Sequence, residues 1–181
     1  LPIFKAAITP RTRMLILNSP GNPTGATLSR GDLDTLADLL RDSEILVLSD
    51  EVYEHIIFDG RAHESVLGHA ELAERSFVIS SFGKTYHITG WKIGYCIAPA
   101  TLTTEFRKVH QYLTFCTFTA AQWALADYLV ADPQPCDSST NHQFAFGPGL
   151  GRSLFDLQTF GPSWPPEPTP LAQQRCSPVT V

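Results

Sequence analysis

The sequence predicts an α/β protein of three layers (αβα), in which a mostly parallel β-sheet lies between two layers of helices. Three short runs of consecutive apolar residues each end in polar residues, and segments with helical spacing separate or follow them. Continuous rather than alternating apolar character is typical of strands buried on both faces of a parallel sheet. Strand, helix and strand in succession also form a βαβ unit, which such sheets are built from.

The first predicted strand is the run Met-Leu-Ile-Leu at 14–17. It ends in Asn-Ser-Pro-Gly-Asn-Pro-Thr-Gly at 18–25, which is a dense turn signal. A helix is expected from about Arg30 to Asp42, because Ser29 is suited to cap it and Asp32 follows three residues later. Its apolar face consists of Leu33, Leu36, Ala37, Leu39 and Leu40.

The second and third strands repeat the same signal. Ile-Leu-Val-Leu at 45–48 stops at Ser-Asp-Glu at 49–51, and Phe-Val-Ile-Ser at 77–80 is the third run. Between them, residues 61–75 are expected to form a polar loop with a short helix around 70–74.

Residues 91–98 predict a fourth strand, which Pro99 closes, and two helices are expected to follow at 102–113 and 120–130. Large aromatic side chains at strand and helix spacing are more often core than substrate pocket. We therefore expect four aromatic residues of this region to be buried: Trp91, Tyr95, Tyr112 and Phe115.

The composition changes after Asp132. Nine of the 14 prolines lie in the last 49 residues, which contain no Lys, Ile, Met or Tyr, and the local periodicity ends there. Such a composition favours disorder. We predict one domain over residues 1–132 and an anomalous Pro-rich tail over 133–181, which is disordered or comes from a shifted reading frame or a wrong exon.

Charge and composition exclude several classes of partner. With 181 residues, a formal net charge of −5 and no basic stripe, the chain is not expected to bind nucleic acid. Its apolar runs are far shorter than the roughly 20 residues that span a membrane. The first residues contain neither an initiator methionine nor the features of a secretion signal, so we expect a chain cut from a longer one.

The cysteines and histidines do not predict a metal centre. The four cysteines are widely spaced without a C-x-x-C pair, and the six histidines lack metal-site spacing. Reduced, incidental cysteines are typical of the cytoplasm, which is the expected compartment. These cysteines are Cys96, Cys116, Cys136 and Cys176.

Polar side chains follow each of the three strong strands. Asn22 follows the first, Asp50 and Tyr53 follow the second, and Ser81 and Lys84 follow the third. In an open parallel sheet, ligands bind beyond the carboxyl ends of the strands, so these side chains are expected to meet at one edge. Loop composition alone could also place them there, and the exact motifs decide between the two interpretations.

The motifs NSPGNPTG, SDEVYEHIIFDG and SFGKTYHITGWKIGYCIAP, in this order and spacing, resemble the class I and II aminotransferases of the pyridoxal-phosphate fold type I superfamily. The resemblance spans roughly residues 10–132 and is strongest to the methionine and kynurenine aminotransferase branch. It implies the central part of the large domain, the cofactor pyridoxal 5'-phosphate, amino-acid and 2-oxo-acid substrates, and a homodimeric parent protein.

By this resemblance, Lys84 is the lysine that forms the Schiff base with the cofactor and later moves a proton at the substrate Cα. Burial beside a cationic cofactor would favour the neutral, nucleophilic amine. Asp50 matches the aspartate that pairs with the pyridine nitrogen, which keeps the ring an effective electron sink.

The resemblance also assigns the remaining cofactor contacts. Asn22 and Tyr53 match the pair that binds the cofactor 3-oxygen, and Ser81 and Lys92 match the phosphate ligands. The family commonly has arginine at the last position, and a lysine constrains the phosphate less. The bond between Asn22 and Pro23 is a candidate cis peptide.

Several family features are not found in this sequence. It has no N-terminal glycine-rich segment, no identifiable ring-stacking aromatic residue and no convincing C-terminal arginine for the substrate carboxylate. We therefore predict a truncated aminotransferase with weak or no turnover alone. Two alternatives remain: a pyridoxal-phosphate-dependent β-lyase acting on cysteine conjugates, and a non-catalytic remnant or partner-binding fragment.

Overall fold

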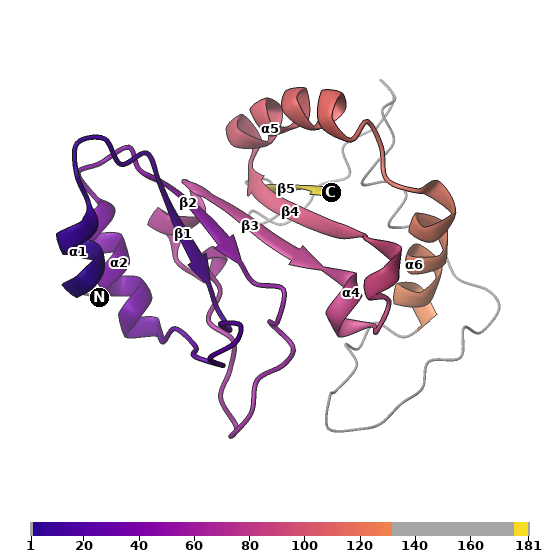
Figure 1. Ribbon diagram of the computed structural model, residues 1–181, viewed down its shortest axis with the longest axis horizontal. Helices are drawn as coiled ribbons and strands as arrows, with labels where there is room; N and C mark the ends of the chain where they lie inside the picture. Colours follow the sequence, from indigo (N-terminus) through magenta and orange to yellow (C-terminus); the bar gives the residue numbers. More distant parts are fainter. Residues whose placement is uncertain (1, 132–175, 181) are drawn as a thin grey trace.

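The computed structural model describes residues 2–131 and 176–180, and its strands form one sheet in the order β1-β2-β3-β4-β5 (Figure 1). β1, β2 and β3 are parallel, whereas β4 is antiparallel to both β3 and β5. β4 is therefore the one reversed strand among those described, and the predicted mostly parallel α/β sheet is confirmed. The strands are β1 Met14–Asn18, β2 Leu46–Asp50, β3 Ser76–Ser81, β4 Gly94–Pro99 and β5 Cys176–Thr180.

The four predicted helices are present in the predicted order, and α1 and α4 are additional to them. The helices are α1 Pro2–Ala7, α2 Arg30–Leu40, α3 Ala70–Ala73, α4 Phe82–Thr85, α5 Ala100–Leu113 and α6 Thr119–Ala131, with 3₁₀ turns η1 Val66–Gly68 and η2 Thr89–Trp91. α2 begins where predicted, because Ser29 and Asp32 form a capping box. It ends two residues early at Leu40, whose carbonyl accepts a hydrogen bond of 3.0 Å from the Arg75 guanidinium.

The main core lies on one face of the sheet. Leu17, Val47 and Val78 point to this face from β1, β2 and β3, and α2 and α3 pack against them. Burying a leucine fully contributes about 1.5–3 kcal/mol. The helical residues of this layer are Leu33, Leu36, Ala37, Leu40 and Leu72.

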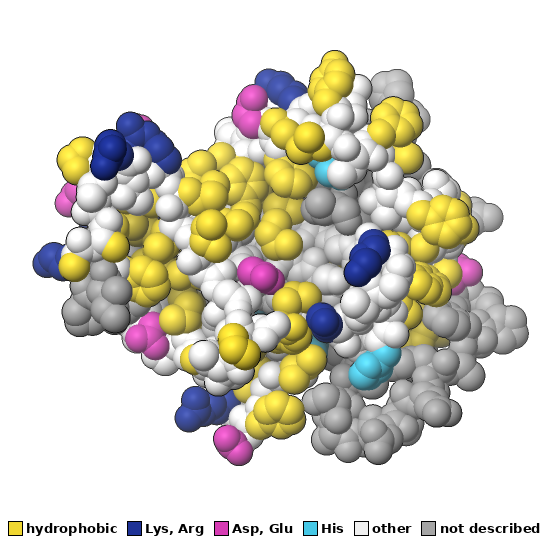
Figure 2. All heavy atoms as spheres, viewed as in Figure 1, with side chains coloured by type: hydrophobic (Ala, Val, Ile, Leu, Met, Phe, Trp, Pro, Cys, Tyr) yellow, Lys and Arg dark blue, Asp and Glu magenta, His cyan; other side chains and the backbone are white. Residues whose placement is uncertain are grey.

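The opposite face is covered by α5, which runs beside β4 and β5 in Figure 1. The Phe106 ring of α5 lies 6.1 Å from the Phe77 ring of β3. Nearer β1 this face is open, since Met14 is 41% and Ile16 is 65% exposed. Figure 2 shows hydrophobic side chains gathered over the sheet there. The second helical layer is thus incomplete within the described residues.

Two of the four aromatic residues predicted to be core are exposed, and that prediction was wrong for them. Tyr112 is 87% and Phe115 is 73% exposed, because the C-terminal end of α5 and the turn after it carry them away from the sheet. Trp91 and Tyr95 are half-buried and pack against a second cluster around Phe82.

β4 begins at Gly94 rather than at residue 91. The preceding residues form η2, and Lys92 adopts a left-handed conformation with φ 56°. A Cβ atom on Gly94 would lie 2.7 Å from the carbonyl oxygen of Ser80, so this position requires glycine.

Most of the predicted tail lies outside the described residues. Residues 176–180 of it form β5, and the boundary at 132 and the origin of the tail stay predictions. Within the described parts of the chain, no helix is both long and apolar enough to cross a membrane.

Candidate functional site

The C-terminal ends of the parallel strands meet at one edge of the sheet. Asn18 of β1 pairs with Asp50 of β2, and Asp50 pairs with Ile79 of β3. Because side chains alternate along a strand, Asp50 and Ser81 lie on the face of the sheet opposite α2. The expected convergence of strand ends is therefore present.

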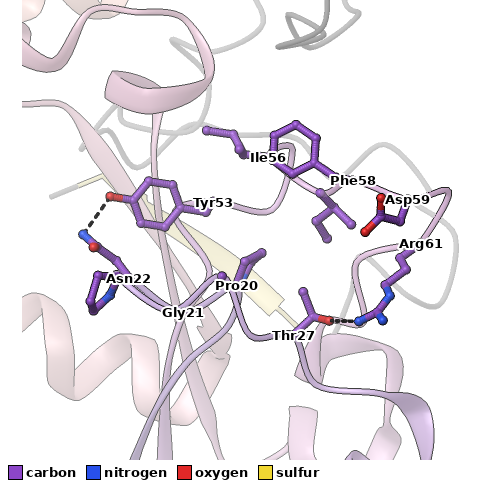
Figure 3. A pocket seen from close by; sticks show the side chains of 12 residues that line it. Pro20, Gly21, Asn22, Thr27, Tyr53, Ile56, Phe58, Asp59 and Arg61 are labelled. Carbon is purple, nitrogen blue, oxygen red and sulfur yellow. Dashed lines mark hydrogen bonds between the residues drawn. The ribbon is translucent and has the colours of Figure 1, made fainter.

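The loop after β1 places Asn22 against the second strand end. The backbone N–H of Asn22 donates to Asn18 Oδ1 at 2.8 Å, which closes the turn. Asn22 Nδ2 then donates to the Tyr53 hydroxyl at 3.2 Å (Figure 3). The peptide bond to Pro23 is cis, as the sequence suggested, and a second cis bond precedes Pro20.

Lys84 reaches the same group from the third strand. It lies on α4, directly after β3, and is partly buried. Its Nζ lies 5.8 Å from the centroid of the Tyr53 ring, within cation–π range. Among the described residues no carboxylate pairs with this amine. Asn22, Tyr53 and Lys84 thus form one group drawn from three strand ends.

Asp50 lies at the same edge and is half-buried. Its Oδ1 accepts a hydrogen bond of 3.2 Å from the backbone N–H of Val52, which orients the carboxylate at the end of β2. The expectation that this carboxylate faces the Lys84 amine across a ring-sized gap stays a prediction.

Ser81 and Lys92 come from neighbouring segments. The Ser81 hydroxyl caps α4 by accepting from Gly83 N–H at 3.0 Å, and it donates to the Ile93 carbonyl at 3.2 Å. Lys92 precedes Ile93 and is exposed. A phosphate bound by Ser81 would have to take the place of the Ile93 carbonyl as the acceptor of its proton.

A cavity of about 420 Å³ adjoins the Asn22–Tyr53 pair, between the loop after β1 and residues 53–61 (Figure 3). Ile56 and Phe58 give it an apolar wall. The Arg61 guanidinium at its side lies 3.5 Å from Thr27 Oγ1. The sequence did not predict this cavity, because two loops distant in sequence form it.

Glu51 is a buried carboxylate that the sequence analysis missed. It is 2% exposed, and its Oε1 accepts from Ser49 Oγ at 2.9 Å and from Val66 N–H at 3.2 Å. Its Oε2 lies 2.7 Å from His63 Nε2. Strand alternation was the available signal, since a residue that follows an outward Asp50 must face the core.

Glu54 is a second carboxylate on the same turn. Its Oε1 accepts from the Ser80 hydroxyl at 2.8 Å and from the Tyr95 hydroxyl at 2.7 Å. Burial, with the Glu54 charge adding to it, raises the pKa of the Tyr95 phenol well above its usual value, so this hydroxyl keeps its proton and donates.

Glu51, Glu54 and His63 bring potential metal-ligand atoms within 4.8 Å of one another. Glu51 and Glu54 already accept hydrogen bonds from protein donors, as described above. Satisfied carboxylates of this kind need no ion, and we assign the cluster to the support of the β2 turn.

Comparison with known proteins adds independent evidence. The family model for aminotransferase class I and II matches residues 3–142. The methionine aminotransferase of Escherichia coli is 54% identical over 131 residues, which cover 72% of this chain and 34% of that protein. Kynurenine–oxoglutarate transaminase 1 of Rattus norvegicus is 37% identical over 126 residues, or 70% of this chain and 30% of that protein.

Solved structures agree. A crystal structure identified as a methionine aminotransferase from Escherichia coli has a TM-score of 0.71 at 54% identity, covering 73% of this chain and 35% of that one. A double mutant of Thermus thermophilus aspartate aminotransferase has a TM-score of 0.62 at 37% identity, covering 67% and 31%. The chain spans about a third of the length of these relatives. The family match, covering most of the chain, together with the shared fold, shows that this chain belongs to the class I and II aminotransferase family.

Proposed function

We propose that this chain is the cofactor-holding part of an aminotransferase that moves an amino group from an amino acid to a 2-oxo acid. The observation that carries the proposal is the group of Asn22, Tyr53 and Lys84, which three strand ends bring together. Members of the family use pyridoxal 5'-phosphate. A lysine amine that no carboxylate among residues 2–131 pairs with, beside a phenol and an amide, is a donor set that suits this cofactor.

When bound, pyridoxal 5'-phosphate supplies an aldehyde that condenses with an amine and a ring that takes electron density from the substrate Cα. Lys84 would supply the amine and would accept the proton from the substrate Cα. Asp50 holds a proton at the ring nitrogen. Asn22 and Tyr53 orient the ring through its oxygen.

In this proposal, Ser81 and Lys92 bind the cofactor phosphate. Ser81 does so through its hydroxyl and Lys92 through its positive charge. Because Lys92 is exposed and its ammonium can rotate, we expect it to contribute charge rather than fixed geometry.

The parent protein, in this proposal, is a homodimer and acts in the cytoplasm. Cys96 and Cys116 are free thiols, and burial raises the pKa of Cys96 to about 11, which keeps it unreactive. Since the chain spans about a third of its relatives, we expect weak or no turnover from it alone.

The chain's four lysines make a sharp test possible: Lys5, Lys84, Lys92 and Lys108. The 181-residue chain is titrated with pyridoxal 5'-phosphate while visible absorbance is recorded. Borohydride then fixes the cofactor on the amine, and mass spectrometry of tryptic peptides locates it. We expect a saturable band and modification of Lys84 above all others. Lys84→Ala should abolish the band, whereas the matched variant Lys108→Ala should keep it.

Equal modification of all four lysines would contradict the proposal and favour the non-catalytic remnant. If turnover is found, the products separate the two reaction types: a new amino acid indicates transfer, and ammonia with pyruvate from a cysteine conjugate indicates β-elimination.

A further inference from the structure

The Glu54 Oε1 atom links three segments next to the candidate site: the turn after β2, β3 and β4. Glu54 belongs to the turn after β2, and its Oε1 accepts hydrogen bonds from Ser80 on β3 and from Tyr95 on β4. Ser80 and Tyr95 face each other in the antiparallel register of these two strands. The carboxylate therefore bridges a pair of side chains that the sheet already holds together.

The residues next to these partners are those that face the proposed cofactor. Tyr53 directly precedes Glu54, and Ser81 directly follows Ser80, which is 2% exposed. Successive strand residues point to opposite faces, so Ser80 turns to Glu54 while Ser81 turns to the site. The hydrogen bond between Ser80 and Glu54 lies on the α2 face of the sheet. It thus connects the chain segments that carry Tyr53 and Ser81, the two residues that face the candidate site.

Other hydrogen bonds hold the start of this turn: the Glu51 N–H donates to the Ile79 carbonyl of β3 at 2.8 Å, and the Glu51 carboxylate contacts Ser49, His63 and Val66. The Glu54 N–H donates to the Glu51 carbonyl at 2.9 Å, and the Ile56 N–H donates to the Tyr53 carbonyl at 2.8 Å. Both bonds lie within the turn and fix its shape. Beyond Glu51, the Glu54 side chain ties the turn to Ser80 on β3 and to Tyr95 on β4.

We propose that Glu54 is a positioning residue: it holds the Tyr53 turn against β3 and β4 and so sets the Tyr53 ring relative to the Lys84 amine. Bonds to an ionised acceptor are about twice as strong as neutral ones. Without it, the buried Ser80 hydroxyl and the half-buried Tyr95 hydroxyl lose their acceptor, and the turn loses its link to β4. The consequence for cofactor binding rests on the proposed function, whereas the effect on the turn does not.

The first test needs no cofactor. Amide hydrogen exchange of Ile56 is measured by NMR in the wild type, Glu54→Ala, Glu54→Gln and the control Glu105→Gln, which changes an exposed carboxylate on α5. We expect exchange at least tenfold faster in Glu54→Ala. In Glu54→Gln, whose amide oxygen still accepts both hydroxyls, exchange should stay within threefold of wild type. Unchanged exchange in Glu54→Ala would overturn the proposal.

The second test uses pyridoxal 5'-phosphate. Glu54→Ala should weaken its dissociation constant at least tenfold and shift the pH midpoint of the visible band, while Glu54→Gln restores both to near wild type. A general loss of structure would not be rescued by the amide. If the wild-type chain forms no Lys84 adduct, the proposed function fails, and the exchange experiment alone decides the role of Glu54.

A milder variant covers the case in which Glu54→Ala does not fold. Tyr95→Phe removes one donor and keeps the ring, and Tyr112→Phe is its matched control because that residue is 87% exposed. We expect about threefold faster Ile56 exchange in Tyr95→Phe only. Equal exchange in the two variants would count against the proposal.

Discussion

At the scale of single residues, Glu51 shows how hydrogen bonds stabilise a buried carboxylate. It takes hydrogen bonds from a strand hydroxyl, a backbone N–H and an imidazole, which come from β2 and from the loop 12–15 residues later. Transfer of such a charge from water is costly unless it is paired and hydrogen-bonded. The pair with His63 therefore fixes the loop that follows the site.

Glu51→Ala is expected to destabilise the chain strongly. It removes the acceptor of the buried Ser49 hydroxyl and Val66 N–H and of the partly buried His63 imidazole. Breaking a buried pair by deleting one partner costs about 3–5 kcal/mol. Glu51→Gln keeps the shape and should cost less, about 1–3 kcal/mol. Urea unfolding followed by circular dichroism measures both. Equal stability of Glu51→Ala and wild type would show that the pair is energetically neutral.

The site residues that sequence could predict are those at strand ends, where position in the chain fixes the edge of the sheet. Asn22, Asp50 and Tyr53 fall into this class. Most partners of Glu51 and Glu54 lie 12–41 residues away in sequence, so their hydrogen bonds could not be predicted, although strand alternation indicated that Glu51 faces the core.

At the scale of elements, the start of α2 depends on the Ser29–Asp32 capping box. The side-chain hydrogen bond from Ser29, and then its backbone hydrogen bond, hold the pKa of Asp32 below the ordinary 3.8. A depressed folded-state pKa gives stability that is fully present above pH 3.8 and is lost as the pH falls through the folded-state value.

Ser29→Ala should lower the free energy of unfolding by about 1 kcal/mol at pH 6. Because Asp32 then loses its main partner, stability should also fall less steeply below pH 3.8 than in the wild type. Urea unfolding at pH 3–6 checks both effects. Thr104→Ala, on the exposed side of α5, serves as the control. A wild-type acid slope retained in Ser29→Ala would contradict this account.

Elements with local signals were predicted well, and those set by distant packing were not. The α2 capping box lies within the four consecutive residues 29–32, so the sequence predicted where α2 begins. The start of β4 depends on the left-handed Lys92 and on the space beside Gly94, and neither is visible in a hydrophobic pattern.

At the scale of the whole molecule, apolar surface is left uncovered. Large apolar residues around the α5–α6 connection are more than 70% exposed, namely Tyr112, Leu113, Phe115 and Phe118. Aromatic character and spacing predicted burial of Tyr112 and Phe115, but burial also requires a neighbour, and the described residues do not supply one.

Leu113→Ala should therefore change the free energy of unfolding by less than about 0.5 kcal/mol, because the side chain is 77% exposed. Leu125→Ala, at a position that is 3% exposed, should cost about 2–5 kcal/mol. Urea unfolding of the two variants gives the comparison. A cost above 2 kcal/mol for Leu113→Ala would show that this leucine is packed.

The order of the first four strands in the sheet is also their order in the chain. During synthesis on a ribosome, each strand can dock on the one before it as soon as it emerges from the exit tunnel, without waiting for a distant partner. Asn22, Asp50 and Tyr53 therefore leave the ribosome before Lys84, and the Lys84 amine is the last of these four groups to arrive.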